Sequence, residues 1–207
     1  MKPNICLSIL FLCVLSASAV FATGIPDLSN CTVTCAYTGP GHPVMYNVPN
    51  GMGSGFDHCN IGLDVIDATI HVVLKDGNGV PISHFPAEDI WLDNGTGDLA
   101  VCGGVHCADG PTDAAGATEF RRPMAAGGFT QILMHVMVTG NQIGGPMPHH
   151  YNSPDISGDL QVNLMDVGLF ASDYFGAYSF RADLVPDGVL SLSDVGRFAM
   201  ALGSMCP

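Results

Sequence analysis

The chain has 207 residues, and its 6 basic and 19 acidic side chains give a formal net charge of −13 at pH 7. An acidic surface of this kind repels nucleic acid and anionic membranes and favours cations, so we expect no nucleic acid as partner. Charged residues make up only 12% of the chain, and the 26 glycines and 14 prolines disfavour long helices, so the composition favours a loop-rich, mainly β protein.

Residues 1–22 have the pattern of a secretory signal peptide. Lys2 precedes an apolar run that ends in the small residues Ala17, Ser18 and Ala19, an Ala-x-Ala cleavage pattern. A transmembrane anchor is the alternative, but the run is a little short, and no later stretch reaches the roughly 20 apolar residues that a span needs. We therefore expect a secreted protein, extracellular or at the cell surface, with no membrane span after cleavage.

Six cysteines follow the signal peptide, and an even number in an oxidising compartment favours disulfides over zinc or catalytic thiolates. Their pairing cannot be derived from the sequence, although Cys102 and Cys107 in the loop CGGVHC form the easiest local pair. Zinc is the alternative, because His58 and His106 lie beside cysteines, but no clean paired CxxC spacing is present. The six are Cys31, Cys35, Cys59, Cys102, Cys107 and Cys206.

The part of the chain from Asp67 to Thr139 has the alternation of apolar side chains that is typical of β-strands. In ATIHVVLKD the alternate residues from Ala68 to Leu74 lie on one face, and in QILMHVMVTG those from Ile132 to Val138 do the same. Turns rich in glycine, aspartate and asparagine separate these runs from shorter ones in DIWLD and ATEF. Several short strands with such turns predict a β-sandwich.

This region resembles the bacterial immunoglobulin-like repeats found in invasin-type and other secreted surface proteins. The resemblance lies in ATIHVVLKDGNGVPI, in ADGPTDAAGATEF, and in the glycine pair and final strand that follow. It implies an immunoglobulin-like sandwich, which we place at residues 23–140 together with a cysteine-rich N-terminal segment. Residues 141–153 contain glycine and proline and show no periodicity, so we expect a linker in which His149 and His150 point into solvent.

The tail, residues 154–207, contains a repeat at a spacing of 28 residues: PDISGDLQVNLMD and ADLVPDGVLSLSD both have acidic residues at the first, fifth and twelfth positions of a twelve-residue window. Ca²⁺ takes six to eight oxygen ligands, and a twelve-residue loop supplies them from alternate positions. The spacing therefore predicts two calcium-binding loops, each followed by a short helix. The predicted ligands of the first loop are Asp155, Ser157, Asp159, the Gln161 carbonyl, Asn163 directly or through water, and Asp166. Those of the second loop are Asp183, Asp187, the Val189 carbonyl, Ser191 through water, and Asp194.

Each loop departs once from the usual calcium-loop pattern. Leu160 stands at the sixth position, where glycine normally permits the sharp turn, and a left-handed backbone there costs leucine about 1–2 kcal/mol. The second loop keeps Gly188 at that position, but Val185 replaces an oxygen ligand at the third. We expect both sites to be weak, with dissociation constants on the order of 10⁻⁴ M. Val162 and Leu190, at the eighth positions, are expected to join the loops by a short β contact.

The paired loops and helices resemble the type I dockerin domain of cellulosomes and related secreted bacterial proteins. The resemblance covers Ser153 to about Gly203 and implies two packed F-hand helices, bound Ca²⁺, and a cohesin-like or other cell-surface protein as partner. Dockerins select that partner at the tenth and eleventh loop positions, often with a Ser-Thr-like pair. Here these positions hold Leu164-Met165 and Leu192-Ser193, which would also suit packing on the sandwich of the same chain.

No convincing catalytic signature is present, since the chain has no GxSxG, HExxH or phosphate-loop motif. We therefore expect a non-enzymatic, secreted calcium-binding module for extracellular or cell-surface attachment or assembly. Its predicted fold is a mainly β immunoglobulin-like sandwich followed by a small α dockerin-like domain with two EF-hand-like loops. The alternatives are a secreted hydrolase or carbohydrate-binding protein with its site in the cysteine-rich segment, and a subunit of a calcium-dependent filament or surface layer.

Overall fold

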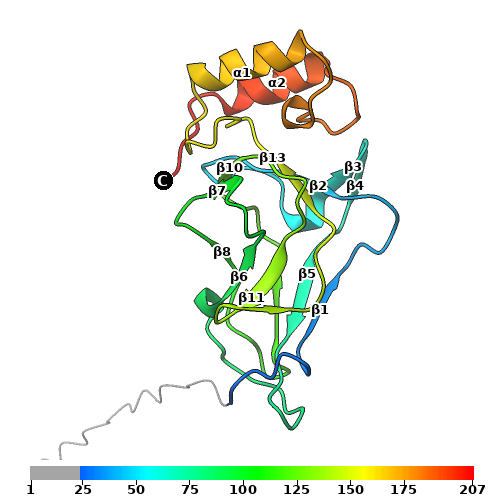
Figure 1. Cartoon of the computed structure of the whole chain (residues 1–207), viewed down its shortest axis with the longest axis vertical. Coiled ribbons are helices and arrows are strands. Elements are labelled where there is room, and N and C mark those ends of the chain that lie inside the picture. Colours follow the sequence, from blue (N-terminus) through cyan, green and yellow to red (C-terminus); the bar gives the residue numbers. More distant parts are fainter. Residues whose placement is uncertain (1–23) are drawn as a thin grey trace, which may run out of the picture.

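The computed structural model describes residues 24–207, so the expected signal peptide at 1–22 lies outside the described residues. Figure 1 shows a β-rich body with two short helices at one end, which confirms the prediction of a β-rich part followed by a helical piece. None of the helices in the described part of the chain has the length and apolar character that crossing a membrane requires.

The strands of the body form four sheets within residues 24–207, and every strand pair is antiparallel except β13 with β2. The first sheet has the order β1 (Thr32–Cys35), β5 (Ile70–Val73), β9 (Ala117–Phe120). The second has the order β12 (Asn141–Ile143), β11 (His135–Val138), β6 (Ile90–Asp93), β8 (His106–Cys107). The third has the order β13 (His150–Asn152), β2 (Val44–Tyr46), β3 (Cys59–Ile61), β4 (Asp64–Ile66). The last consists of β10 (Ala126–Gly128) and β7 (Leu99–Val101). The described residues also contain three short 3₁₀ helices: η1 (Phe56–His58), η2 (Ala87–Asp89) and η3 (Phe180–Ala182).

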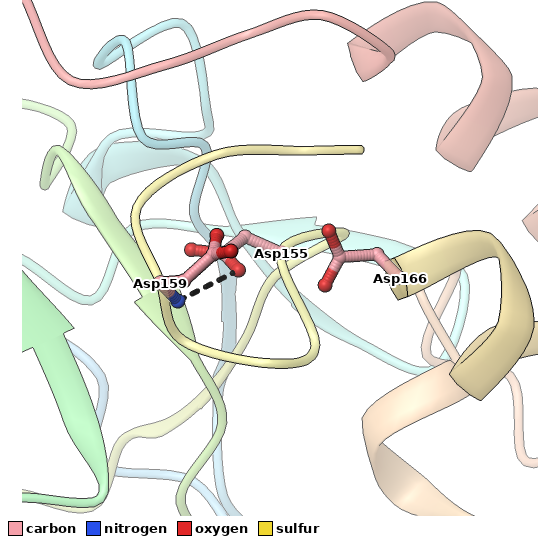
Figure 2. A group of neighbouring side chains, drawn as sticks. All are labelled: Asp155, Asp159 and Asp166. Carbon is pink, nitrogen blue, oxygen red and sulfur yellow. Dashed lines mark hydrogen bonds between the residues drawn. The ribbon is translucent and has the colours of Figure 1, made fainter. Parts of the chain in front are cut away.

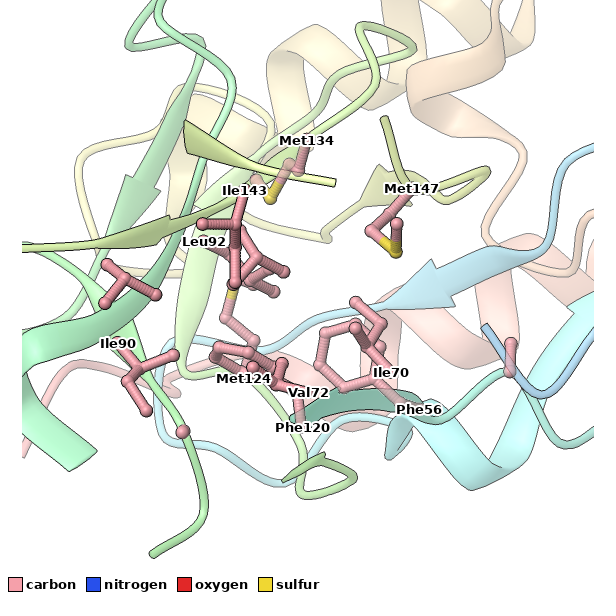
Figure 3. Packing of buried hydrophobic residues seen from close by; sticks show 14 of the residues in the cluster. Phe56, Ile70, Val72, Ile90, Leu92, Phe120, Met124, Met134, Ile143 and Met147 are labelled. Atoms are coloured by element: carbon pink, nitrogen blue, oxygen red, sulfur yellow. The ribbon is translucent and has the colours of Figure 1, made fainter. Parts of the chain in front are cut away.

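The main hydrophobic core collects the apolar faces of these strands. Ile70 and Val72 of β5 are fully buried, as the alternation predicts, and they share one cluster with Ile90 and Leu92 of β6 (Figure 3). Burying an aliphatic side chain of this size contributes about 1.5–3 kcal/mol. The same prediction is wrong for Ile132, which is 47% exposed because β11 begins only at His135.

The expected linker at residues 141–153 is wrong, because this segment contributes two strands to the body. β12 pairs with β11, and β13 runs parallel to β2. His149, expected in solvent, is fully buried, and its Nε2 lies 2.8 Å from the carbonyl oxygen of Ala68. His150 is partly buried and stacks on the His42 ring with a centroid separation of 4.3 Å. The segment is therefore folded onto the body and is not a flexible tether.

The tail carries α1 (Leu164–Tyr174) and α2 (Leu192–Ala201), which begin at equivalent positions of the sequence repeat. Each helix starts with a capping box, in which the side chain of Asn163 or Ser191 accepts a backbone N–H of the first turn. Such a cap stabilises a helix by about 1 kcal/mol. The rings of Phe170 and Phe198, also equivalent, have centroids 4.9 Å apart and join the two helices.

A second buried cluster joins the tail to the body. Tyr46 of β2 lies in one hydrophobic cluster with Phe170 of α1 and Phe198 of α2. The guanidinium of Arg197 lies 4.0 Å from the centre of the Tyr46 ring, a cation–π contact between α2 and β2. The helices are therefore packed on the body, at the end where β2, β10 and β13 lie in Figure 1.

The expected disulfide between Cys102 and Cys107 is not formed. Cys102 follows β7, which pairs with β10, whereas Cys107 lies in β8 and pairs with Trp91 of β6. The chain thus places the two cysteines on different sheets, and Cys102 instead bonds Cys206, which is 104 residues away. The other cysteines of the described chain are free thiols: Cys31, Cys35, Cys59 and Cys107.

Candidate metal centre

The first loop of the tail brings three carboxylates together. Asp155, Asp159 and Asp166 each offer one oxygen, and these oxygens lie within 4.8 Å of one another (Figure 2). Asp155 and Asp166 are fully buried, and Asp159 is exposed. Three negative charges at this separation repel one another, and a divalent cation among them would offset that repulsion.

Backbone N–H groups of the loop fix the carboxylate of Asp155. Its Oδ1 accepts from the N–H of Gly158 at 2.9 Å and from that of Asp159 at 3.2 Å, the bond drawn in Figure 2. Its Oδ2 accepts from the N–H of Leu160 at 2.7 Å. Desolvation nevertheless raises the pKa of Asp155, because burial outweighs these hydrogen bonds. A cation bound to this carboxylate would offset the cost of its buried charge.

Asp166 closes the first loop from its twelfth position, at the start of α1. Its Oδ1 accepts from the N–H of Ser157, and its Oδ2 accepts from that of Asn163, each at 2.9 Å. The Ser157 hydroxyl donates to Asp155 Oδ1, and the Asn163 amide donates to Asp159 Oδ2, each at 3.2 Å. All six predicted ligand residues of this loop are therefore linked in one hydrogen-bonded cluster, which Gln161 joins through its N–H to Asp159.

The second loop repeats three of these hydrogen bonds at the same positions. Oδ1 of Asp194, at the twelfth position, accepts from the N–H of Val185, and its Oδ2 accepts from that of Ser191, each at 2.8 Å. Oδ2 of Asp183, at the first position, accepts from the N–H of Gly188 at 3.0 Å. The residues at the first, third, sixth, ninth and twelfth positions thus make equivalent hydrogen bonds in both loops. The sequence repeat is therefore also a structural repeat.

The fifth and seventh positions match as well. The N–H of Gln161 donates to Asp159 Oδ1 at 2.9 Å, and the N–H of Val189 donates to Asp187 Oδ1 at 3.0 Å. Within residues 24–207 the carbonyl oxygens of Gln161 and Val189 accept no hydrogen bond. Both carbonyls therefore remain free acceptors, as the predicted ligand role requires.

The sixth position has the left-handed backbone in both loops, as predicted. Gly188 has a φ of 82°, and Leu160 has a φ of 66° although it is not glycine. The cost to leucine of about 1–2 kcal/mol has to be offset locally. The N–H of Leu160 is bound by Asp155, and its carbonyl accepts from the N–H of Cys206 at 3.1 Å.

The carboxylates of the second loop are gathered less closely. Among the described residues, Asp183, Asp187 and Asp194 do not form a group within the 4.8 Å separation that the first loop meets. Oδ1 of Asp183 is buried without a hydrogen-bond partner, and desolvation raises the pKa of this carboxyl. An orphaned buried carboxylate oxygen is costly unless a ligand satisfies it. The loop thus retains a free oxygen at its first position, where a calcium ligand is expected.

The predicted β contact between the two loops does not form in the described chain. Val162 is buried as expected, but its N–H donates to the carbonyl of Ser204 at 2.8 Å, and its carbonyl accepts from the N–H of Gly203 at 2.9 Å. Leu190 is only partly buried and packs against the second cluster. The C-terminal segment therefore pairs with the first loop where the second loop was expected.

Gly127 and Tyr178, which lie outside the two loops, set the positions of ligand carboxylates, and no sequence pattern identified them. A Cβ at Gly127 in β10 would lie 1.7 Å from Asp155 Oδ2, so only glycine leaves room for this carboxylate. The hydroxyl of Tyr178 donates to Asp183 Oδ2 at 2.8 Å and so fixes the orientation of this carboxylate. Both contacts depend on the tertiary fold or on the connection between the loops, which the repeat itself does not encode.

The apolar residues at the tenth and eleventh loop positions do not pack on the body. Leu164 is 85% exposed and Leu192 is 78% exposed, and Met165 is exposed beside Leu164. These positions lie at the starts of α1 and α2, so their side chains are presented to solvent at equivalent points of the repeat.

Comparison with known proteins gives no match. No protein-family model fits the chain, and searches of curated proteins and of solved structures find no similar protein. The geometry of the two loops is therefore the basis for assigning a function.

Proposed function

We propose that the protein is a secreted, non-catalytic module that binds Ca²⁺ through both loops and acts in extracellular or cell-surface attachment or assembly. The observation that carries this proposal is the hydrogen-bond pattern that recurs at equivalent positions of the two loops, 28 residues apart. The donor set is made of carboxylate, hydroxyl, amide and backbone carbonyl oxygens. Such a set suits a hard cation such as Ca²⁺, whereas soft metals prefer thiolate and imidazole ligands.

We further propose that the tail is a dockerin-like unit and that the body is an immunoglobulin-like sandwich. Two loop-and-helix units with capping boxes at both helix starts support the first assignment. Antiparallel sheets that share one apolar core support the second. The tail of this protein differs from a freely tethered dockerin in its contacts, because Tyr46 and Val48 of the body complete its buried cluster.

The bound ions have a structural role in this proposal. The first loop lies against β10, where the N–H of Gly128 donates to the carbonyl of Asp155 at 2.6 Å. Calcium held by Asp155 would therefore stabilise the contact between tail and body as well as the loop itself. With free Ca²⁺ at roughly ten times the dissociation constant, each occupied site adds about 1.4 kcal/mol to the free energy of unfolding.

The partner in this proposal is a cohesin-like or other cell-surface protein. The exposed apolar side chains of Leu164, Met165 and Leu192 supply a contact surface at the helix starts, next to both loops. Calcium would act on this surface indirectly, by fixing the orientation of the helices that present it. Binding of the partner is therefore expected to depend on calcium.

Calorimetric titration of the purified protein with CaCl₂ tests the calcium assignment. We expect two binding events in the parent, one in Asp155→Asn, one in Asp183→Asn, and none in the double variant. Asp64→Asn is the matched control, because Asp64 is an exposed carboxylate of β4 outside both loops. The assignment fails if Ca²⁺ produces no binding heat in the parent and leaves its melting temperature unchanged.

A further inference from the structure

The first loop is held between two segments that are distant in sequence. On one side lies β10, where Gly127 allows close approach to the Asp155 carboxylate and Gly128 donates to the Asp155 carbonyl. On the other side lies the C-terminal segment, residues 203–206, which hydrogen-bonds to residues 160–162 of the loop. Both segments therefore support the shape of the loop from outside it.

The C-terminal segment makes three backbone hydrogen bonds with the loop. Two of them involve Val162, and the third joins the N–H of Cys206 to the carbonyl of Leu160 at 3.1 Å. Gln161, a predicted carbonyl ligand, forms the β-bridge with Met205 between them. The C-terminal segment therefore contacts both the strained residue at the sixth loop position and the neighbour whose carbonyl is a predicted ligand.

A disulfide connects the two segments that hold the loop. Cys102 bonds Cys206, and the N–H of Cys102 donates at 2.8 Å to the carbonyl of Ala125, the residue before β10. The disulfide thus ties residues 203–206 to the β10 side of the loop. Without it, residues 203–206 would be held in place by these hydrogen bonds, by the hydrogen bond that the Asn50 amide donates to the Ser204 hydroxyl, and by local packing.

We propose that the Cys102–Cys206 disulfide controls the calcium affinity of the first loop, so that this site becomes fully competent only after oxidation. This inference rests on the proposed calcium function. The bond forms by thiol–disulfide exchange with a disulfide oxidant: the two thiols lose two protons and two electrons, and the oxidant is reduced to two thiols. A dithiol reductant reverses the step and is itself converted to a cyclic disulfide.

The second loop lacks this dependence. Its carboxylates are held by N–H groups of the same loop and by the Tyr178 hydroxyl, and the carbonyl of Asp183 accepts from the side chain of Asn152 in β13. None of these partners belongs to residues 203–206. Reduction is therefore expected to distinguish the two loops, which a general loss of stability would not do.

The size of the effect follows from the fraction of molecules in which the C-terminal segment stays on the loop. The apparent dissociation constant rises in inverse proportion to the population that is competent to bind. After reduction the segment is attached covalently only through α2, and three backbone hydrogen bonds hold it on the loop. A docked fraction near one tenth would weaken binding by about tenfold. We expect that loss at the first loop and less than about twofold at the second.

The test compares oxidised and reduced protein in two backgrounds. Asp183→Asn leaves only the first loop, Asp155→Asn leaves only the second, and CaCl₂ is titrated calorimetrically into each. The same titrations are run on the variant Cys102→Ser with Cys206→Ser. Cys107→Ser is the matched control, because this free cysteine lies in β8, outside the sheet of β7 and β10. We expect the double serine variant and the reduced parent to lose affinity at the first loop alone, and Cys107→Ser to behave as the parent.

Amide hydrogen exchange supplies a second measurement if the double serine variant is poorly folded. On reduction of the folded parent, the N–H groups of Val162 and Gly203 should exchange faster, while those of β5 should not change. Equal affinity before and after reduction, or equal losses at both loops, would overturn the inference and leave the calcium function standing. Absence of calcium binding in the oxidised parent would overturn both.

Discussion

Gly127→Ala is the change that most directly tests whether the body helps to build the first calcium loop. The added Cβ would lie 1.7 Å from Oδ2 and 2.6 Å from the carboxyl carbon of Asp155, about half of an ordinary van der Waals separation for the oxygen. The carboxylate has to move by more than about 1 Å, because Gly127 is part of the β10 backbone and cannot easily give way.

That displacement breaks the 2.7 Å hydrogen bond between Asp155 and the N–H of Leu160. A hydrogen bond to a charged group contributes about 1.5–3 kcal/mol, and the misplaced oxygen no longer coordinates the ion at the required distance. We therefore expect calcium affinity at the first loop to fall by at least about a hundredfold, which corresponds to roughly 2.7 kcal/mol. The second loop should keep its affinity.

Calorimetric titration in the Asp183→Asn background measures this loss, with Gly145→Ala as the control because a Cβ at Gly145 meets no atom within 4 Å. Combining Gly127→Ala with Asp155→Asn should cost no more affinity than Asp155→Asn alone, since both act through the same carboxylate. Parent-like calcium binding in Gly127→Ala would refute the reasoning that the body shapes this loop.

Three other predictions follow from individual contacts. Tyr178→Phe removes the hydrogen bond that orients Asp183, so calorimetry should show several-fold weaker calcium binding at the second loop and none of this loss at the first. Leu160→Gly relieves the left-handed backbone, and urea unfolding of the calcium-free protein should show a gain of about 1 kcal/mol or more; a loss would contradict the assigned strain. Burial lowers the pKa of His149 from 6.5 to about 4, so the unfolded chain takes up a proton first as the pH falls below 6.5. The free energy of unfolding should therefore fall by about 2 kcal/mol through His149 as the pH is lowered from 8 to 5. Urea unfolding of His149→Phe should lack this part of the pH dependence.

The features that were predicted correctly are those encoded in short-range patterns. Alternation placed Ile70 and Val72 in the core, because the side chains of a strand alternate between its two faces. The repeat located both loops and both helices, because the capping residues Asn163 and Ser191 are themselves part of the repeated sequence. Local chemistry was sufficient in each of these cases.

The features that were missed depend on contacts between distant parts of the chain. Residues 141–153 were interpreted as a linker because their glycines and prolines interrupt any periodicity, yet strands of three residues need no longer pattern once β2 and β11 are available as partners. The burial of His149 likewise depends on the carbonyl of Ala68, 81 residues earlier. The Cys102–Cys206 disulfide and the approach of Gly127 to Asp155 are determined by how the tail docks, which neither segment encodes alone.

The docking of the tail also changes what calcium is expected to do. In a module on a flexible linker, calcium would order the loops and helices and leave the rest of the protein unaffected. Here Asp155 is hydrogen-bonded to β10, Phe198 shares a cluster with Tyr46, and Cys206 forms a disulfide with Cys102. Binding energy at the first loop is therefore transmitted to the body through contacts that exist only in the docked arrangement. Added calcium should raise the melting of the body and the tail together in one transition, observed by near-ultraviolet circular dichroism of Trp91 in β6. If calcium shifts only a separate helical transition and leaves the Trp91 signal unchanged, tail and body are not coupled through this loop.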